Sequence, residues 1–326
     1  MQKHLKAPFP YFGGKSLIGL RVWELFGPVS NYVEPFAGSL AALLARPTPV
    51  YGLETVNDWS AHVANVWRAI KYDPQALASY CVGPVCEVDT EATHNALVQG
   101  EFDLRTRLGD PAYCDIQAAA WWIKGESEWI GGGWASGDGP WSWTRRKGWV
   151  RRTAGTGINR KLPQLSNAGT GINRKLPQLS NAGTGQYAQR VAWLEDWFCG
   201  LRDRLCETRI ACGDWQRVLN PASTVNHGLT AVFLDPPYDS TEYVYGAGTA
   251  SISQDVRDWC IANGTNPLLR IILCGRSEEH DALLAHGWHR ESWTTRKGYS
   301  KKKDNDSERL WYNFNCESSA NTFFKI

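Results

Sequence analysis

Residues 233–240, FLDPPYDS, place a carboxylate, two prolines and a tyrosine directly after the apolar run 230–234. Because proline has no backbone N–H, a buried strand must end at Asp235. The Asp235 carboxylate and the Pro236 carbonyl are then two acceptors on a rigid turn, since a residue before proline adopts an extended conformation. Two such acceptors can bind both N–H groups of one amine and orient its lone pair for reaction. The alternative is an ordinary turn, with Asp235 as a cap and Tyr238 in the core.

Two further strand ends carry residues suited to ligand binding. The Ala37-Gly38-Ser39 turn lets the backbone approach a ligand closely before a helix begins. Asp58 ends the next apolar run, where its carboxylate can accept both hydroxyls of a ribose. Ligands of open parallel sheets bind beyond the carboxyl ends of the strands, so the three strand ends predict one site. The simpler alternatives are a tight loop at Gly38 and a helix N-cap at Asp58.

Strands and helices alternate in both halves of the chain and predict an α/β fold with a mostly parallel sheet covered on both faces. Strands are predicted in NYVEPFAG (31–38), PVYGLETVND (49–58), TRIACGD (208–214), TAVFLD (230–235) and LRIILCG (269–275). Helices are predicted in SLAALLAR (39–46), WSAHVANVWRAIKYDP (59–74), AQRVAWLEDWFCGLRDRL (188–205), around SISQDVRDWCIANG (251–264) and in SEEHDALLAHG (277–287). HRESWTTRKGY (289–299) and SERLWYNFN (307–315) predict a C-terminal antiparallel hairpin at the sheet edge.

A block of different composition, residues 81–189, separates two segments, 1–80 and 190–326, that we expect to form one domain. The block is rich in Trp, Gly and Arg, and it contains AGTGINRKLPQLSN twice, at 154–167 and 168–181. Two copies of so short a unit cannot build a stacked-repeat core. The duplication therefore predicts a tolerated insertion in a loop, with a repeated Arg-Lys pair facing phosphates as the alternative.

Positive charge is concentrated in the same block. The whole chain has a net charge of +2, but residues 139–194 contain ten basic residues and no Asp or Glu, which leaves a charge of −8 elsewhere. A basic segment in an otherwise acidic chain favours a polyanionic partner met at one place. A solvated surface loop is the alternative.

The remaining composition excludes several classes of protein. A hydrophobic content of 43% with 21% charged residues is ordinary for a globular chain. No stretch approaches the roughly 20 apolar residues of a membrane span, and the first residues have no apolar core typical of a signal peptide. The nine cysteines are scattered without a CxxC pair, which favours reduced thiols over disulfides or a zinc site. We expect a cytoplasmic protein without a metal or a membrane partner.

Four motifs in this order resemble those of a known family. PYFGGK (10–15), VEPFAGS (33–39), VND (56–58) and LDPPY (234–238) are similar to the ordered motifs of Dam-type DNA adenine N6-methyltransferases. The resemblance covers residues 8–75 and 190–315. It implies a Rossmann-like methyltransferase fold in which a target-recognition region, here residues 81–189, interrupts the catalytic domain.

The resemblance also implies S-adenosyl-L-methionine as the cofactor. The implied cofactor-binding residues are Tyr11, Lys15, Glu34, Pro35, Phe36, Gly38, Asp58, Asp214 and Asp235. Tyr11 and Lys15 match contacts to the methionine end of the cofactor. Asp58 matches the carboxylate that holds the ribose, and Asp214 falls near the adenine. One position departs from the commoner family pattern, because Ser39-Leu40 follows Gly38 where a second glycine is usual.

The implied catalytic residues are Asp235, Pro236, Pro237 and Tyr238. Tyr238 would stack on an adenine that has left the double-stranded DNA, since the amine cannot be reached inside the duplex. The residues expected to contact DNA phosphates are Arg145, Arg146, Lys147, Arg151 and Arg152. Three alternatives remain open: cytosine N4 methylation, RNA methylation on the same scaffold, and a DNA-binding protein that keeps the fold without catalysis.

Overall fold

The computed structural model describes residues 5–9, 15–128, 134–135, 141–144, 148–151, 186–237, 249–292 and 308–316. The chain divides into two compact units. Unit 1 comprises Met1–Lys6, Gly13–Trp59 and Glu207–Ile326, and unit 2 comprises Ala7–Phe12 and Ser60–Cys206. The 14-residue duplication lies outside the described residues.

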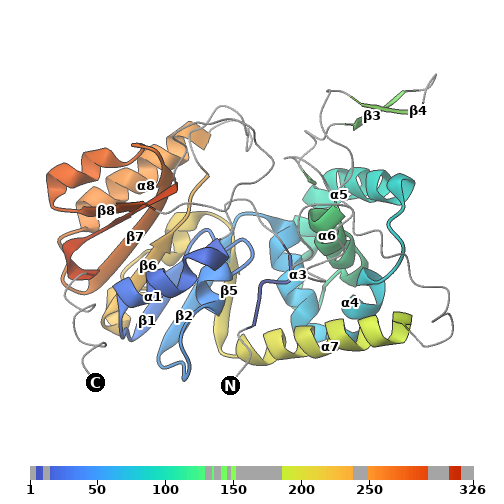
Figure 1. Cartoon of the computed structure of the whole chain (residues 1–326), viewed down its shortest axis with the longest axis horizontal. Helices are drawn as coiled ribbons and strands as arrows, with labels where there is room; N and C mark the ends of the chain where they lie inside the picture. The colour runs from blue at the N-terminus through green and yellow to red at the C-terminus, as the bar shows by residue number, and fades with distance from the viewer. Residues whose placement is uncertain are drawn as a thin grey trace. The chain divides into compact units, whose positions relative to one another are not determined.

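Unit 1 is built on a seven-stranded mixed sheet with the order β5-β2-β1-β6-β7-β9-β8 (Figure 1). Its strands are β1 (Asn31–Glu34), β2 (Leu53–Asp58), β5 (Thr208–Cys212), β6 (Thr230–Leu234), β7 (Leu269–Arg276), β8 (His289–Ser292) and β9 (Glu308–Tyr312). The neighbours from β5 to β7 pair in parallel, whereas β9 is antiparallel to both β7 and β8. The prediction of an α/β fold with a mostly parallel sheet and an antiparallel C-terminal hairpin is confirmed.

The order of the five parallel strands contains a reversal. Counted along the chain, they lie side by side as 3-2-1-4-5, which is the order of a Rossmann-like sheet up to its fifth strand. The first strand, β1, therefore has β2 on one side and β6 on the other. Strands β2 and β5 are added on one side of β1, and β6 and β7 are added on the other, so the strand order reverses between β1 and β6.

The central strands of this sheet are buried on both faces because helices cover both. In β1, Tyr32 and Val33 point to opposite faces, as successive strand residues do. The Tyr32 ring lies 4.8 Å from the ring of Trp23 in α1 (Gly19–Phe26). Val33 belongs to an apolar cluster with Val256 of α8 (Thr249–Asn263). Helices α1 and α8 thus shield opposite faces of the sheet (Figure 1).

The shorter helices of unit 1 include two that differ from the prediction. The SLAALLAR segment forms only α2 (Ala41–Leu44), because Leu40 is left-handed and the residue before Pro47 cannot continue a helix. SEEHDALLAHG forms a 3₁₀ helix, η5 (Asp281–His286), instead of an α-helix. The remaining 3₁₀ turns described in unit 1 are η1 (Lys15–Leu17), η3 (Trp215–Val218) and η4 (Val225–His227).

Unit 2 is mainly helical. Its helices are α3 (Ala61–Tyr72), α4 (Pro74–Cys81), α5 (Glu87–Arg107), α6 (Ile116–Glu128) and α7 (Gln186–Arg204). Pro74 ends α3, as predicted, but it also begins α4, where Asp73 accepts a hydrogen bond from the Ala76 N–H at 2.9 Å. Arg68 of α3 donates to three carbonyls around the α5–α6 turn. Among the described residues, no helix is both long and apolar enough to cross a membrane.

The unit boundaries differ from those expected. We expected residues 60–80 and 190–206 in the domain that carries the sheet, but α3, α4 and α7 belong to unit 2. The reason is their packing, since α4 packs against α6 and α7, and α3 packs against α6. Helical periodicity shows that an element has an apolar face but not which partner covers it.

The Trp-rich and Arg-rich block contains a regular element that its composition did not indicate. Strands β3 (Trp141–Thr144) and β4 (Gly148–Arg151) pair antiparallel, with Trp143 opposite Trp149. Of the predicted phosphate contacts, Arg151 ends β4, whereas Arg145, Arg146, Lys147 and Arg152 lie outside the described residues. The alternation of WSWT was the available signal for a strand.

Candidate functional site

The reversal of strand order places two predicted motifs next to each other. In open α/β sheets, ligands bind beyond the carboxyl ends of the strands where the order reverses. Here those ends belong to β1 and β6, which pair directly with Val33 opposite Val232. Asp235 follows β6, and the Pro35–Leu40 turn follows β1. Both predicted segments therefore lie at the position where this class of sheet binds ligands.

Asp58 and Asn57, the last two residues of β2, hold the turn after β1 in place. The Gly38 N–H donates to Asp58 Oδ2 at 2.8 Å, and the Ala37 N–H donates to the Asn57 carbonyl at 2.9 Å. The buried Asn57 side chain donates to the Pro35 carbonyl at 3.0 Å and to the Gly213 carbonyl at 2.9 Å. One asparagine therefore joins the loops that follow β1 and β5. Asn57 lies within the VND motif, but motif inspection assigned it no role, because that role depends on β5 lying beside β2.

Two residues of the turn after β1, Gly38 and Leu40, have the backbone conformation that glycine favours, whereas Ser39, at the position of the usual second glycine, has no positive φ. Gly38 has φ 47°, and Leu40 has φ 59° in the left-handed region. A left-handed leucine costs roughly 1–2 kcal/mol, whereas complete burial of its side chain contributes about 1.5–3 kcal/mol. Leu40 is fully buried, so packing offsets the backbone cost. The departure from the family pattern is thus compatible with a tight turn.

Aromatic groups surround the two aspartates on this side of the site. Asp214 is exposed and accepts a hydrogen bond from the Gln216 N–H at 2.9 Å, which makes it the N-cap of η3. The next residue, Trp215, stacks on Phe36 of the β1 turn, with ring centroids 5.9 Å apart. Trp59, which follows Asp58, is 66% exposed. The sequence motifs did not single out this exposed indole.

Asp235 forms a buried ion pair with Lys15. Lys15 Nζ lies 2.9 Å from Asp235 Oδ1, and the side chains are 3% and 18% exposed. Burial lowers the pKa of Lys15, but the attraction of the nearby carboxylates, chiefly Asp235, outweighs burial and leaves the pKa above its ordinary value. The ammonium is therefore charged, and it favours the anionic form of Asp235. Pro236 is buried and Pro237 half-buried beyond it.

A second carboxylate approaches the same ammonium. Glu308 Oε2, from the first residue of β9, lies 3.8 Å from Lys15 Nζ, and the Glu308 side chain is 13% exposed. Burial raises the pKa of Glu308 against the attraction of Lys15. The fully buried Cys274 of β7 has a pKa raised by burial and by Asp235, so its thiol is protonated. The sequence motifs contain neither Glu308 nor Cys274.

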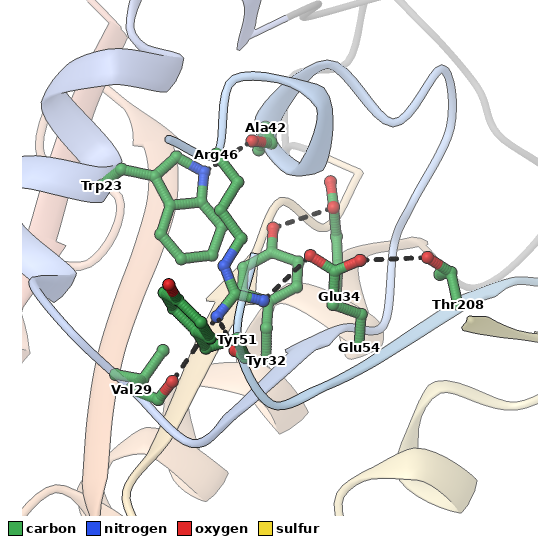
Figure 2. Close-up of polar contacts among 9 residues, drawn as sticks. All are labelled: Trp23, Val29, Tyr32, Glu34, Ala42, Arg46, Tyr51, Glu54 and Thr208. Atoms are coloured by element: carbon green, nitrogen blue, oxygen red, sulfur yellow. Dashed lines mark hydrogen bonds and ion pairs between the residues drawn. The ribbon is translucent and has the colours of Figure 1, made fainter. Parts of the chain in front are cut away.

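Glu34 lies at the end of β1 but is buried, at 3% exposure. Its Oε2 accepts a hydrogen bond from the Tyr32 hydroxyl at 2.8 Å (Figure 2). Burial raises the pKa of Glu34 to about 8, and Asp235 raises it further, whereas the Tyr32 hydroxyl opposes the rise. At neutral pH Glu34 is therefore mostly protonated. Because Glu34 is buried, its contribution to the site is structural and comes from inside the sheet.

A separate buried ion pair lies beside Tyr32 and Glu34. Arg46 Nη1 lies 2.9 Å from Glu54 Oε1, and the two side chains are 6% and 5% exposed (Figure 2). Arg46 also donates to the Tyr51 carbonyl at 2.8 Å and lies over the Trp23 ring at 4.8 Å. Glu54 Oε2 accepts from the Thr208 hydroxyl at 3.0 Å. These contacts tie the start of β2 to β5 and to the segment after α2.

Most predicted site residues within the described ranges converge on the carboxyl ends of β1, β2, β5 and β6. Those that converge are Glu34, Pro35, Phe36, Gly38, Asp58, Asp214, Asp235, Pro236 and Pro237, together with Lys15 through its ion pair. Tyr11 and Tyr238 lie outside the described residues. No protein-family model matches this chain, and no curated protein sequence matches it.

Proposed function

We propose that this protein is a DNA adenine N6-methyltransferase that uses S-adenosyl-L-methionine. The observation that carries the proposal is the position of Asp235 at the carboxyl end of β6, directly beside the turn after β1 that Asp58 holds. Two carboxylates, Asp58 and Asp235, thus lie at the carboxyl ends of the strands on either side of β1. The four ordered motifs support the same assignment.

The residues present fit the proposed cofactor. Asp58 is half-buried, and its bond to the Gly38 N–H fixes the carboxylate at the end of β2, where it would accept from a ribose. The stacked Phe36 and Trp215 and the exposed indole of Trp59 supply aromatic surface suited to an adenine ring. When bound, the cofactor would supply an electrophilic methyl group on its sulfonium.

Asp235 and Pro236 would activate the adenine amine. The Asp235 carboxylate and the Pro236 carbonyl each accept one amine N–H, which draws the nitrogen toward tetrahedral geometry and fixes the direction of its lone pair. Lys15 contacts Asp235 Oδ1 at 2.9 Å and holds the carboxylate at the end of β6. The positive charge of Lys15 keeps the carboxylate ionised and able to accept. No covalent intermediate with the protein is needed.

The basic segment would contact DNA. Arg145 and Arg146 lie between β3 and β4 in the sequence, in the segment without acidic residues. Neutralising phosphates releases counterions, so affinity falls with salt in proportion to the number of contacts. Changing both arginines to alanine should weaken DNA binding and flatten its salt dependence. An unchanged slope would remove these residues from the interface.

Labelled cofactor and unmethylated duplex DNA test the proposal. The wild-type chain should transfer label to adenine N6, and Asp235→Ala should reduce transfer by about 10²–10³-fold, as for loss of a direct transition-state contact. Asp255→Ala, at an exposed position of α8, is the matched control and should retain activity. Equal labelling by wild type and Asp235→Ala, or none by either, would contradict the assignment. Label on cytosine N4 or on RNA alone would redirect it.

A further inference from the structure

Glu308 lies outside the sequence motifs, but in the structure Lys15 links it to Asp235. We propose that Glu308 is a positioning residue for the methyl-transfer reaction, acting through Lys15 to keep Asp235 available as an acceptor. This inference rests on the proposed function. It is carried by the position of one buried ammonium between two carboxylates, at 2.9 Å and 3.8 Å.

The strand arrangement explains how the end of the chain supplies this group. Strand β9 is antiparallel to β7, so the first residue of β9 lies at the carboxyl end of β7, with Glu308 opposite Arg276. The carboxyl ends of the parallel strands form one edge of the sheet, where Asp235 also lies. An added parallel strand would have placed its first residue at the opposite edge. The antiparallel insertion of β9 therefore brings a carboxylate to the site from a distant part of the sequence.

The two contacts of Lys15 are unequal in a way that matters for Asp235. At 2.9 Å the ammonium is hydrogen-bonded to Asp235, whereas 3.8 Å to Glu308 is too long for a hydrogen bond but permits strong attraction in a buried site. Lys15, Asp235 and Glu308 together carry a net charge of −1. The ammonium therefore does not fully neutralise Asp235, because its field is shared with Glu308.

The sharing of the Lys15 ammonium between Asp235 and Glu308 favours the proposed chemistry. A carboxylate fully paired with one ammonium is a weaker acceptor for the N–H of a neutral amine. With Glu308 as a second attraction, Lys15 can move toward Glu308 as the amine binds, and Asp235 keeps its acceptor strength. Without the Glu308 charge, the attraction of Lys15 is directed more strongly to Asp235. Activity would then fall although every group that touches the substrate is unchanged.

The charged and titratable neighbours define the pH dependence. Lys15, Asp235 and Arg276 act on Glu308, and Cys274 and Glu34 complete the same buried group. Burial raises the pKa of Glu308, and protonation removes its attraction for Lys15. The rate should therefore fall as the pH is lowered through that pKa. Glu308→Gln mimics the protonated form and should lose this part of the pH profile.

The kinetic test compares two variants that separate charge from shape. Glu308→Gln keeps the size of the side chain without its charge, and Glu308→Asp keeps the charge on a shorter chain. Glu308→Gln should lower kcat by about tenfold, less than the 10²–10³-fold loss on removing a direct contact, with the KM for DNA and the Kd for cofactor within about twofold. Glu308→Asp should recover most of the loss. A purely structural role predicts the opposite ranking, because the shorter side chain leaves a gap.

A second measurement is independent of catalysis. The pKa of Lys15, followed by NMR of isotopically labelled lysine side chains in the protein without ligands, should fall in Glu308→Gln, because one of the carboxylates that raise it is neutralised. Asp235→Asn should lower the Lys15 pKa further, since its carboxylate is closer. Lys15→Arg assigns the signal. Thermal melts of each variant exclude loss of folding as the cause.

The outcomes distinguish the two proposals. An active wild type whose kcat, pH profile and Lys15 pKa are unchanged by Glu308→Gln would overturn the role of Glu308 alone. A lower Lys15 pKa with unchanged kcat would also overturn it, because the coupling would then have no consequence for the reaction. Absence of methyl transfer by the wild-type chain would overturn the proposed function together with this role. Loss of kcat with rescue by Glu308→Asp and a lower Lys15 pKa in Glu308→Gln supports it.

Discussion

Unit 1 contains two buried ion pairs that have different surroundings. In the Arg46–Glu54 pair, the guanidinium has a carboxylate, a backbone carbonyl and an aromatic face as partners, and the carboxylate also accepts from Thr208. In the Lys15–Asp235 pair, the ammonium faces a second carboxylate, Glu308, at a longer distance. The first pair is balanced in charge and contacts, whereas in the second one ammonium is shared by two carboxylates.

The two ion pairs differ in whether they can still bind a ligand. A buried pair whose hydrogen-bonding capacity is filled has nothing left to offer a ligand, and removing one partner leaves a buried charge. A pair with a shared ammonium and partly exposed carboxylates can still accept an N–H donor or attract a cation. Perturbed groups that lie close together at a ligand-binding position are candidates for function for this reason. Both pairs affect the pKa of Glu34, since the charges of Asp235 and Glu54 each raise it.

The largest expected effect is on stability, at the balanced pair. Arg46→Met leaves Glu54 buried without its cation and should lower the free energy of unfolding by about 3–5 kcal/mol, measured by urea denaturation. Methyl transfer per folded molecule should be unchanged, because no group at the strand ends is altered. The double variant Arg46→Met with Glu54→Leu should recover much of the loss. A cost below about 1 kcal/mol for the single variant would show that the pair is hydrated.

Glu34 should make stability depend on pH. Its pKa is about 8 in the folded chain against 4.5 for an unperturbed side chain, so the folded state binds the proton more tightly. Its contribution to stability is complete below pH 4.5 and is lost as the pH rises through 8. Relative to Glu34→Gln, the wild type should lose about 4–5 kcal/mol across this window. Glu24→Gln, at an exposed position, is the control, and a pH-independent difference for Glu34→Gln would contradict the buried proton.

The third prediction tests whether the cluster with the shared ammonium tolerates loss of its cation. Lys15→Met should cost only about 1–2 kcal/mol of stability, less than Arg46→Met, because Asp235 and Glu308 are 18% and 13% exposed and can be hydrated or protonated. Activity should nevertheless fall strongly, since Asp235 loses the ammonium that holds it in place. Equal stability losses for Lys15→Met and Arg46→Met would remove the distinction between the two pairs.

The sequence predicted the elements of unit 1 well because their patterns are local. Strands such as TAVFL are apolar throughout and end at prolines, which requires no knowledge of the rest of the chain. The unit boundaries were misplaced because α3 and α7 have apolar faces that fit either a sheet or a helical bundle. The short α2 and the 3₁₀ helix η5 reflect a left-handed Leu40 and a left-handed Gly287, which periodicity does not register.

The site was predictable only where it follows strand ends. Asp58, Gly38 and Asp235 each end or follow an apolar run, and parallel pairing brings such positions together. The roles of Asn57 and Glu308 were missed because their partners are set by tertiary contacts: Asn57 bonds to a carbonyl after β5, and Glu308 arrives on an antiparallel strand. Lys15 was assigned to a ligand, whereas in the structure it contacts Asp235, the carboxylate proposed to bind the amine.

The smallest expected effect tests the coupling between Tyr32 and Glu34, which lie beside both pairs. Tyr32→Phe removes the hydroxyl that donates to Glu34 Oε2 and should cost about 1 kcal/mol near pH 6, where Glu34 is protonated. Because the hydroxyl opposes the rise in the pKa of Glu34, its loss raises that pKa further, and the cost should grow above pH 8. Urea denaturation at pH 6 and pH 9 measures both values, with Tyr51→Phe, whose side chain is 73% exposed, as the control. An equal cost at the two pH values would mean that the hydroxyl does not distinguish the carboxylate from the carboxylic acid. Glu34 would then be uncoupled from Tyr32, and its proton would be set by burial and Asp235 alone.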